Sequence, residues 1–154
     1  MTLDNFHFIL GQTIMYCQII EHDVKMIYAA MCKGDMNNTL NIIEKQKWTL
    51  WHSVKELKKL DFSDSNNYIS ANDYNFLSQM AHKRDYWCHK TYLQFVYNKS
   101  FLDSIEYEKE CQKLQRDNEK LSAVYKALEE VRLNAMRDFN IRFRLLLLRH
   151  FISL

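Results

Sequence analysis

The sequence predicts an all-α protein, an antiparallel bundle of four to five helices that ends in one long C-terminal helix. Proline, the strongest helix breaker, is absent from the 154 residues, and glycine occurs only twice. Hydrophobic residues make up 47% of the chain and charged residues 26%, a mixture suited to amphipathic helices. The length fits a single domain. We expect its core over about 1–100 and a helical extension over about 101–150.

The first three predicted helices cover residues 3–33, 38–60 and 70–98. The first has apolar side chains at helical spacing and ends at KGD, whose glycine suits the position after a helix. The second ends in a lysine-rich turn, which favours a helix C-terminus. Between the second and third, DFSDSNNYISAN is rich in Ser, Asn and Asp and predicts a loop. The third begins near Ser70, where SAND resembles a capping box.

A fourth helical pattern runs from about residue 101 to 143, with charges in nearly every turn. Its core positions alternate four and three residues apart, as in about three heptads of a coiled coil. These positions are Tyr107, Cys111, Leu114, Asn118, Leu121, Tyr125 and Leu128. A polar residue such as Asn118 at a core position commonly fixes register. Two interpretations are open: the helix pairs with another copy, or it packs back on its own bundle.

The general features predict a cytoplasmic protein. The cysteines form no C-x-x-C pair, so we expect reduced, buried thiols at Cys17, Cys32, Cys88 and Cys111. The first residues lack the positive region of a signal peptide, and no long uncharged run occurs, so we expect no membrane span. A formal net charge of +2 makes no general case for nucleic-acid binding, which needs charge gathered on one face.

The stretch AHKRDYWCHKTY, in the third predicted helix, gathers polar groups on one arc. With Arg84 set at 0°, Tyr92 lies at about 80°, Asp85 at about 100°, His89 at about 140° and His82 at about 160°. The neighbours of Arg84 on the helix surface are mostly apolar, so its guanidinium emerges from the apolar stripe. The arginine therefore needs an acidic partner or an anionic ligand, because an unpaired buried charge costs several kcal/mol.

Glu21 in the first predicted helix has the reciprocal property. It lies among apolar positions, between Cys17 and Val24, where an isolated carboxylate is costly. We therefore expect Glu21 to face Arg84.

The segment RDYWCH resembles the R-x(4–6)-H motif of the HEPN superfamily, a group of small helical nucleotide-binding and RNase domains, and it has a polar residue directly after the arginine. The layout is similar too, because a long first helix carries an internal acid and the motif lies late in the bundle. The resemblance covers roughly residues 1–100. A second stretch, RLLLLRH from Arg144 to His150, also fits the R-x(4–6)-H spacing. It matches the motif less well, because leucine follows its arginine and it lies at the chain end.

This resemblance implies a metal-independent endoribonuclease with no cofactor and an active site at a homodimer cleft. It also implies a role as a toxin or in phage defence such as abortive infection. Arg84 and His89 match the catalytic pair, and Asp85 stands at the polar position. Family members with an antitoxin partner often carry a tyrosine two residues beyond the histidine. Here Thr91 stands at that position and Tyr92 follows it, which departs from that subgroup.

The chemistry of these side chains fits RNA cleavage. Attack of a 2′-hydroxyl on the adjacent phosphate needs a proton acceptor, a proton donor for the leaving 5′-oxygen, and positive charge beside the phosphorane oxygens. Imidazole exchanges protons near neutral pH, and guanidinium is a planar fork matched to phosphate. His89 and Arg84 supply these groups, and Asp85 is spaced to orient the imidazole. The supporting positions are Glu21, Tyr92 and His82.

A non-catalytic alternative remains open: a helical interaction or regulatory protein in which Arg84 and Glu21 form only a structural pair. Metal binding is disfavoured, because His82 and His89 lie about 10.5 Å apart along a helix axis. A thiol nucleophile at Cys88 is disfavoured, because adjacent helical residues point about 100° apart.

The C-terminal run MRDFNIRFRLLLLRHFISL mixes arginines with leucines and phenylalanines. It fits a buried terminal helix, a membrane-surface helix or an RNA-contacting edge. A buried helix is the commonest outcome for so apolar a segment.

Overall fold

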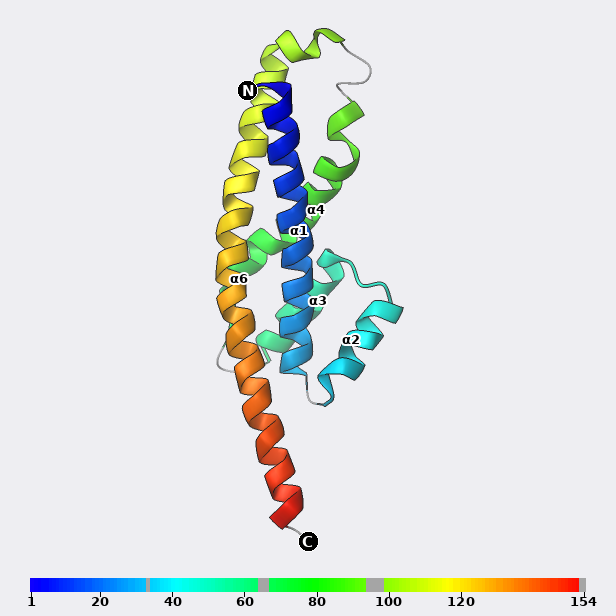
Figure 1. Ribbon diagram of the computed structural model, residues 1–154, viewed down its shortest axis with the longest axis vertical. Coiled ribbons are helices and arrows are strands. Elements are labelled where there is room, and N and C mark those ends of the chain that lie inside the picture. Colours follow the sequence, from blue (N-terminus) through cyan, green and yellow to red (C-terminus); the bar gives the residue numbers. More distant parts are fainter. Residues whose placement is uncertain (33, 64–66, 94–98, 153–154) are drawn as a thin grey trace.

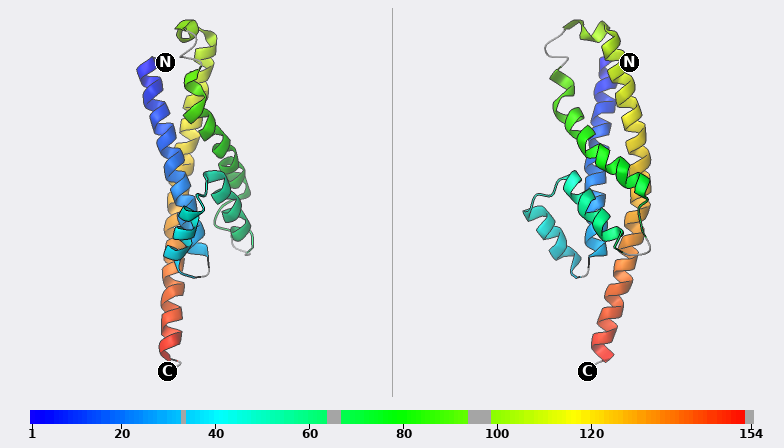
Figure 2. Two further views of the ribbon diagram at one scale, coloured as in Figure 1. Left: turned by 90° about the vertical axis from the view of Figure 1, so that its right-hand side faces the viewer. Right: turned by 180° about the vertical axis from the view of Figure 1, so that it is seen from behind.

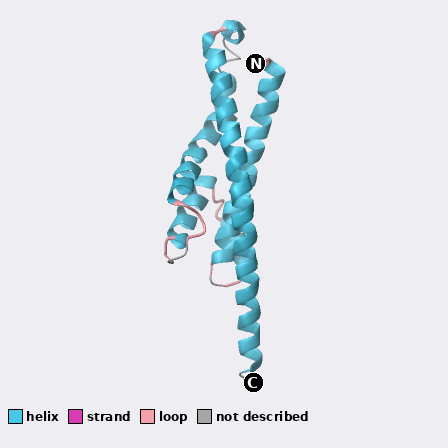
Figure 3. Cartoon of the chain, turned by 90° about the vertical axis from the view of Figure 1, so that its left-hand side faces the viewer, coloured by secondary structure: helices cyan, strands magenta, loops and turns pink. Residues whose placement is uncertain are grey.

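The computed structural model describes residues 1–32, 34–63, 67–93 and 99–152, with side chains described to residue 140 except that of Lys99. In chain order the elements are α1 (Leu3–Met31), α2 (Met36–Lys45), α3 (Leu50–Asp61), α4 (Ala71–His89), the 3₁₀ helix η1 (Lys99–Asp103) and α6 (Ile105–Ile152). No strand occurs in these residues (Figure 1, Figure 3). The predicted all-α class with a long C-terminal helix is therefore confirmed.

α1 and the first half of α6 lie side by side along the long axis and share the largest helix–helix interface of the described residues (Figure 1, Figure 2). The two helices run in the same direction, since the Phe6 ring contacts that of Tyr107 at one end and Asp23 pairs with Arg132 towards the other. The expected antiparallel arrangement holds for α4 but not for this pair. The reason is that α4 carries the chain back, so that α6 begins beside the N-terminus of α1 (Figure 1).

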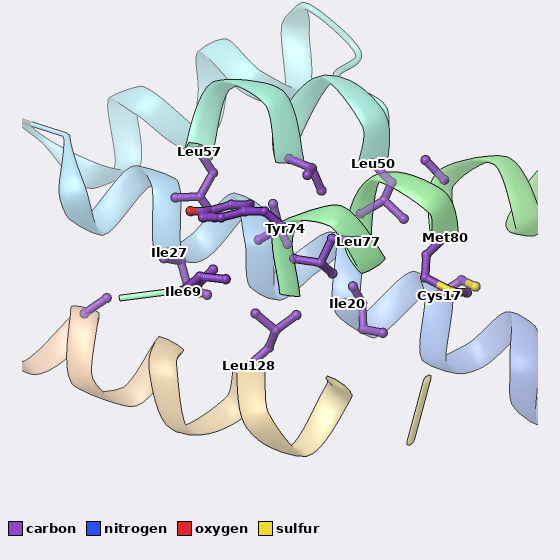
Figure 4. Packing of buried hydrophobic residues seen from close by; sticks show 14 of the residues in the cluster. Cys17, Ile20, Ile27, Leu50, Leu57, Ile69, Tyr74, Leu77, Met80 and Leu128 are labelled. Carbon is purple, nitrogen blue, oxygen red and sulfur yellow. The ribbon is translucent and has the colours of Figure 1, made fainter. Parts of the chain in front are cut away.

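The larger of two buried clusters joins α1, α3, α4 and α6. Figure 4 shows the ring of Tyr74 beside Leu57, while Leu77, Ile20 and Leu128 converge on the same core from three helices. The second cluster lies around Phe6, Leu10, Trp87, Phe101, Tyr107, Cys111 and Leu114. Burial of whole aliphatic and aromatic side chains, at about 1.5–3 kcal/mol each, is the main stabilising contribution to these helix contacts.

The heptad positions of α6 face α1. Leu114 and Leu121 are completely buried, and the Asn118 amide donates hydrogen bonds to the Ile9 carbonyl at 3.4 Å and to the Thr13 hydroxyl at 3.1 Å. Of the two interpretations of the heptad pattern, packing on its own bundle is the one observed for these side chains. The core consequently extends well past residue 100, into the segment expected to be an extension.

The single helix expected over residues 38–60 is two helices, so that prediction is wrong. Between α2 and α3, Lys47 has a positive φ of 51°, which an α-helix does not allow. Thr49 then caps α3, because its hydroxyl accepts a hydrogen bond from the backbone N–H of His52 at 3.4 Å. The N-cap preference of this threonine was the signal for the break.

The N-cap predicted at Ser70 is confirmed, but the return bond of Asp73 goes to the serine hydroxyl and not to the backbone N–H that a capping box uses. The Ser70 hydroxyl oxygen accepts a hydrogen bond from the backbone N–H of Asp73 at 3.1 Å and donates to its carboxylate at 2.6 Å. α4 ends at His89, earlier than the predicted 98, and residues 91–93 form a further short helical stretch. The last part of the predicted helix, residues 94–98 with Phe95, lies outside the described residues.

A buried acid, Asp61, fixes the entry into α4. Its carboxylate accepts hydrogen bonds from the backbone N–H groups of Tyr68 and Ile69, at 2.8 and 3.1 Å, and from the Tyr74 hydroxyl at 2.9 Å. Burial and the Asp61 carboxylate raise the pKa of Tyr74, so its hydroxyl stays a donor. One carboxylate thus joins the end of α3 to the first turn of α4.

None of the described helices combines the length and the apolar character needed to cross a bilayer. The side chains of Arg142, Arg144, Arg149 and His150 lie outside the described residues. The three interpretations of the C-terminal run therefore stay as predictions.

Candidate active site on α4

The second half of α4 presents three different faces. Lys83 and Trp87 face α6, where both contact Asp117. Arg84 faces α1. His82, Asp85 and His89 are exposed. Helical geometry explains the division, because side chains three or four positions apart share a face and adjacent side chains do not.

Two acids of α6 hold α4 in this orientation. Asp117, 4% exposed, accepts a hydrogen bond from the Trp87 indole at 3.0 Å and also bonds the Lys83 ammonium. Glu110, two turns earlier in α6, accepts a hydrogen bond from the Tyr86 hydroxyl. Each buried carboxylate is thereby satisfied, as a buried charge requires. The contacts fix the rotation of α4 about its axis and so decide which side chains remain exposed.

Burial and the nearby Glu110 carboxylate raise the pKa of Tyr86. Its hydroxyl therefore keeps its proton at neutral pH and acts as a donor to Glu110, so it is no candidate for a general base. Lys113 completes this group, with its ammonium 3.3 Å from the centre of the Tyr86 ring and 3.8 Å from a Glu110 oxygen. Tyr86 thus anchors the helix.

The predicted pairing of Glu21 with Arg84 is confirmed, with Nη1 of the arginine 3.3 Å from Oε2 of the glutamate. The other oxygen of Glu21 accepts a hydrogen bond from Lys25 at 2.6 Å. The expectation of a buried arginine is wrong, since 36% of the Arg84 side chain is exposed against 18% for Glu21. Arg84 lies at the edge of the α1–α4 interface, where its long stem packs on protein while its charged end meets water.

Partial exposure sets the expected strength of this pair. We expect Glu21→Gln to lower the free energy of unfolding by about 1 kcal/mol, because solvent screens an ion pair at a protein edge. Urea denaturation of Glu21→Gln, Arg84→Ala and the double variant measures the coupling free energy between the two positions. A coupling free energy indistinguishable from zero contradicts the pair. The control is Glu56→Gln, which removes a more exposed ion pair with Lys59 and is expected to change the free energy of unfolding less than Glu21→Gln does.

Asp85 and His89 lie one helical turn apart, and both are exposed. In the described part of the chain they make no hydrogen bond or ion pair with each other. The proposed orientation of the imidazole by Asp85 therefore stays a prediction. His82, also exposed, lies one turn before Asp85 on the same face.

The structure separates Thr91 from Tyr92. Thr91 is fully buried and its hydroxyl donates to Glu110 at 3.3 Å, so it belongs to the anchor of α4. Tyr92 is 43% exposed, and its ring lies 5.7 Å from that of His7 in α1, centre to centre. His7 is a second imidazole near the end of the motif that sequence reasoning missed. No local signal marks it, because only the fold brings these distant positions together.

The buried thiol of Cys17, which faces α4 from α1, is unsuited to nucleophilic chemistry. Cys17 is buried beside Cys88, and burial raises the pKa of its thiol to about 12, an effect that Cys88 increases and Arg84 opposes. The thiol stays protonated at neutral pH, and the thiolate is the reactive form. Among the residues that the structure describes, no three His, Cys, Asp or Glu side chains lie close enough together to hold a metal ion.

No family model, curated protein or solved structure matches the chain.

Proposed function

We propose that the protein is a metal-independent endoribonuclease of HEPN type that cuts single-stranded RNA as a homodimer. The observation that carries the proposal is the state of Arg84. The Arg84 guanidinium forms an ion pair with Glu21, yet about a third of the arginine side chain is exposed. Among the described residues, the guanidinium donates no hydrogen bond, so its N–H groups are available to a ligand. An exposed histidine, His89, lies on the same helix. The biological role, growth arrest as a toxin or defence against phage, follows from the family resemblance.

Arg84 serves as the group that stabilises charge on the phosphate. A guanidinium has five N–H donors in a rigid fork, and a single ion pair leaves most of them available. Glu21 restrains the side chain before substrate arrives, so little conformational entropy is lost on binding. Donors placed in advance beside a developing oxyanion lower the barrier because they need not reorganise during the reaction.

His89 serves as the proton-transfer group. Its position in the last turn of α4 leaves the imidazole exposed to substrate, and imidazole is the side chain that exchanges protons near neutral pH. Asp85, one turn earlier on the same face, is near enough to accept a hydrogen bond from the imidazole once substrate orders the two side chains. In this role the aspartate fixes the tautomer and does not react itself.

The placement of the pair supports an active site shared by two chains. Arg84 and His89 point about 140° apart around α4 and are about 7.5 Å apart along its axis. The two side chains of one helix are therefore poorly placed to contact the same phosphate. A second copy packed against the exposed face brings another His89 towards the phosphate held by Arg84. The two histidines then supply the proton acceptor and the proton donor. An antitoxin or other regulatory protein would act by covering this face.

A cleavage assay in a chelator tests the proposal. The purified protein is expected to cut single-stranded RNA at an unchanged rate in excess EDTA, because the required positive charge comes from Arg84. The rate with added Mg²⁺ is the comparison. Activity that disappears on chelation contradicts the proposal. Absence of cleavage under all conditions favours the alternative, a helical interaction or regulatory protein in which the Arg84–Glu21 pair is only structural.

A further inference from the structure

An open cavity lies on the surface between α3 and α4, and the proposed active site does not use it. Its volume is about 380 Å³. Three lysines and two exposed aromatic rings line it, together with Ser78 of α4; the lysines are Lys55, Lys58 and Lys59, and the rings are Trp51 and Phe62. A concave site with both aromatic faces and cationic groups can hold a ligand that has a planar ring, which stacks on the aromatic faces, and an anionic group, which meets the ammonium groups.

The aromatic side chains at this cavity are unusually exposed for their size. Trp51 is 48% and Phe62 46% exposed. The Lys55 ammonium lies 5.0 Å from the centre of the Trp51 ring, and that of Lys58 lies 5.8 Å from the centre of Phe62. Each ring thus has a cation beside it, and stacking faces with cations nearby are the recurrent components of single-strand nucleic-acid sites.

The cavity also carries uncompensated positive charge. Lys59 pairs with Glu56 at 2.7 Å. Lys55 and Lys58 make no ion pair within the residues that the structure describes, so both ammonium groups are available to an anion. Two such groups about one helical turn apart on α3 are spaced to meet neighbouring phosphates of a flexible strand.

We propose that this cavity is a binding site for single-stranded RNA, in which a base stacks on Trp51 and backbone phosphates meet Lys55 and Lys58. The cavity's own chemistry selects a single-stranded nucleic acid; the choice of RNA over DNA rests on the proposed function. The site holds substrate and takes no part in the chemical step.

The cavity is aligned with the motif on α4. Ser78, which lines the cavity, lies at about 120° on the helical projection that places Asp85 at about 100° and His89 at about 140°. Ser78 and His89 are about 16.5 Å apart along the axis. A strand bound at the cavity can therefore follow one face of α4 towards His89, which makes the cavity an extension of the substrate path.

Fluorescence anisotropy with a labelled, fully 2′-O-methylated single-stranded RNA tests the site, because such RNA has no attacking hydroxyl and cannot be cut by the proposed mechanism. Trp51→Ala is expected to weaken binding about tenfold, the effect of losing one stacked base. Trp51→Phe, which keeps an aromatic face, is expected to retain most of the affinity. Lys55→Gln/Lys58→Gln is expected to weaken binding and to reduce the slope of log affinity against log salt by about 1.4.

The matched control is Lys109→Gln/Lys120→Gln, which removes the same charge from exposed positions of α6 and is expected to bind like wild type with an unchanged salt slope. Wild-type binding by Trp51→Ala and by the Lys55/Lys58 double variant overturns the inference, as does equal weakening in the α6 control. The test is separable from the proposed function, because it measures binding of an RNA that cannot be cut and so does not depend on catalysis. If the protein binds RNA through the cavity but cuts no RNA, the binding site is supported and the proposed nuclease activity is contradicted.

Discussion

Replacing His89 with alanine is expected to lower the rate of RNA cleavage by about a hundredfold or more, because proton transfer by a positioned side chain contributes about 10²–10⁴-fold. The thermal unfolding midpoint is expected to stay close to that of wild type. The imidazole is exposed and makes no hydrogen bond among the described residues, so its loss opens no cavity and leaves no buried group unpaired. Initial rates on a labelled single-stranded RNA, with circular dichroism melts of the same samples, measure both quantities.

The control for this substitution is His22→Ala, which removes another exposed imidazole from α1 and is expected to cleave at the wild-type rate. If the two histidines of a dimer serve one phosphate, an equal mixture of wild-type and His89→Ala chains is expected to fall below half of wild-type activity after subunit exchange. Full activity of His89→Ala contradicts its assignment. Equal losses in both variants show an effect of surface charge rather than of catalysis.

Replacing Asp61 with alanine is expected to lower the free energy of unfolding by about 3 kcal/mol or more. The carboxylate is fully buried and accepts hydrogen bonds from the backbone N–H groups of Tyr68 and Ile69 and from the hydroxyl of Tyr74. Its removal leaves these donors without their acceptor, and each unsatisfied buried polar group costs about 1–3 kcal/mol. Urea denaturation measures the loss.

Tyr74→Phe is the graded comparison, because it removes a single one of these bonds and keeps the aromatic ring in the core. We expect it to cost about 1 kcal/mol, clearly less than Asp61→Ala. Equal effects of the two variants, or a loss below 1 kcal/mol for Asp61→Ala, contradict the view that this carboxylate joins α3 to α4.

The features that sequence predicted correctly depend on local pattern. The bounds of α1 follow from helical spacing that runs from Leu3 almost without interruption. The pairing of Glu21 with Arg84 could be predicted because each charge interrupts an apolar stripe, and two such interruptions on neighbouring helices favour a common partner. Their degree of burial could not, since it depends on how far α4 is rotated against α1.

The features that were missed depend on tertiary contacts or on signals with more than one meaning. The break before α3 was not predicted, because apolar side chains at helical spacing continue across it from Ile43 to Leu50, although Thr49 is an available N-cap. The heptads of α6 fit both dimerisation and internal packing, and only the contact of Asn118 with α1 decides between them. The cavity beside Trp51 requires α3 and α4 to be placed first.

The chemical form of the 3′ ends of the RNA fragments tests the central claim most directly, that Arg84 and His89 promote attack by the adjacent 2′-hydroxyl without a metal ion. Wild-type protein is incubated with a short single-stranded RNA in excess EDTA, and the fragments are identified by mass spectrometry. The account predicts 2′,3′-cyclic phosphate ends paired with 5′-hydroxyl ends, formed by wild type and nearly absent with His89→Ala. Fragments with 3′-hydroxyl and 5′-phosphate ends, which arise when water is the nucleophile, would contradict it.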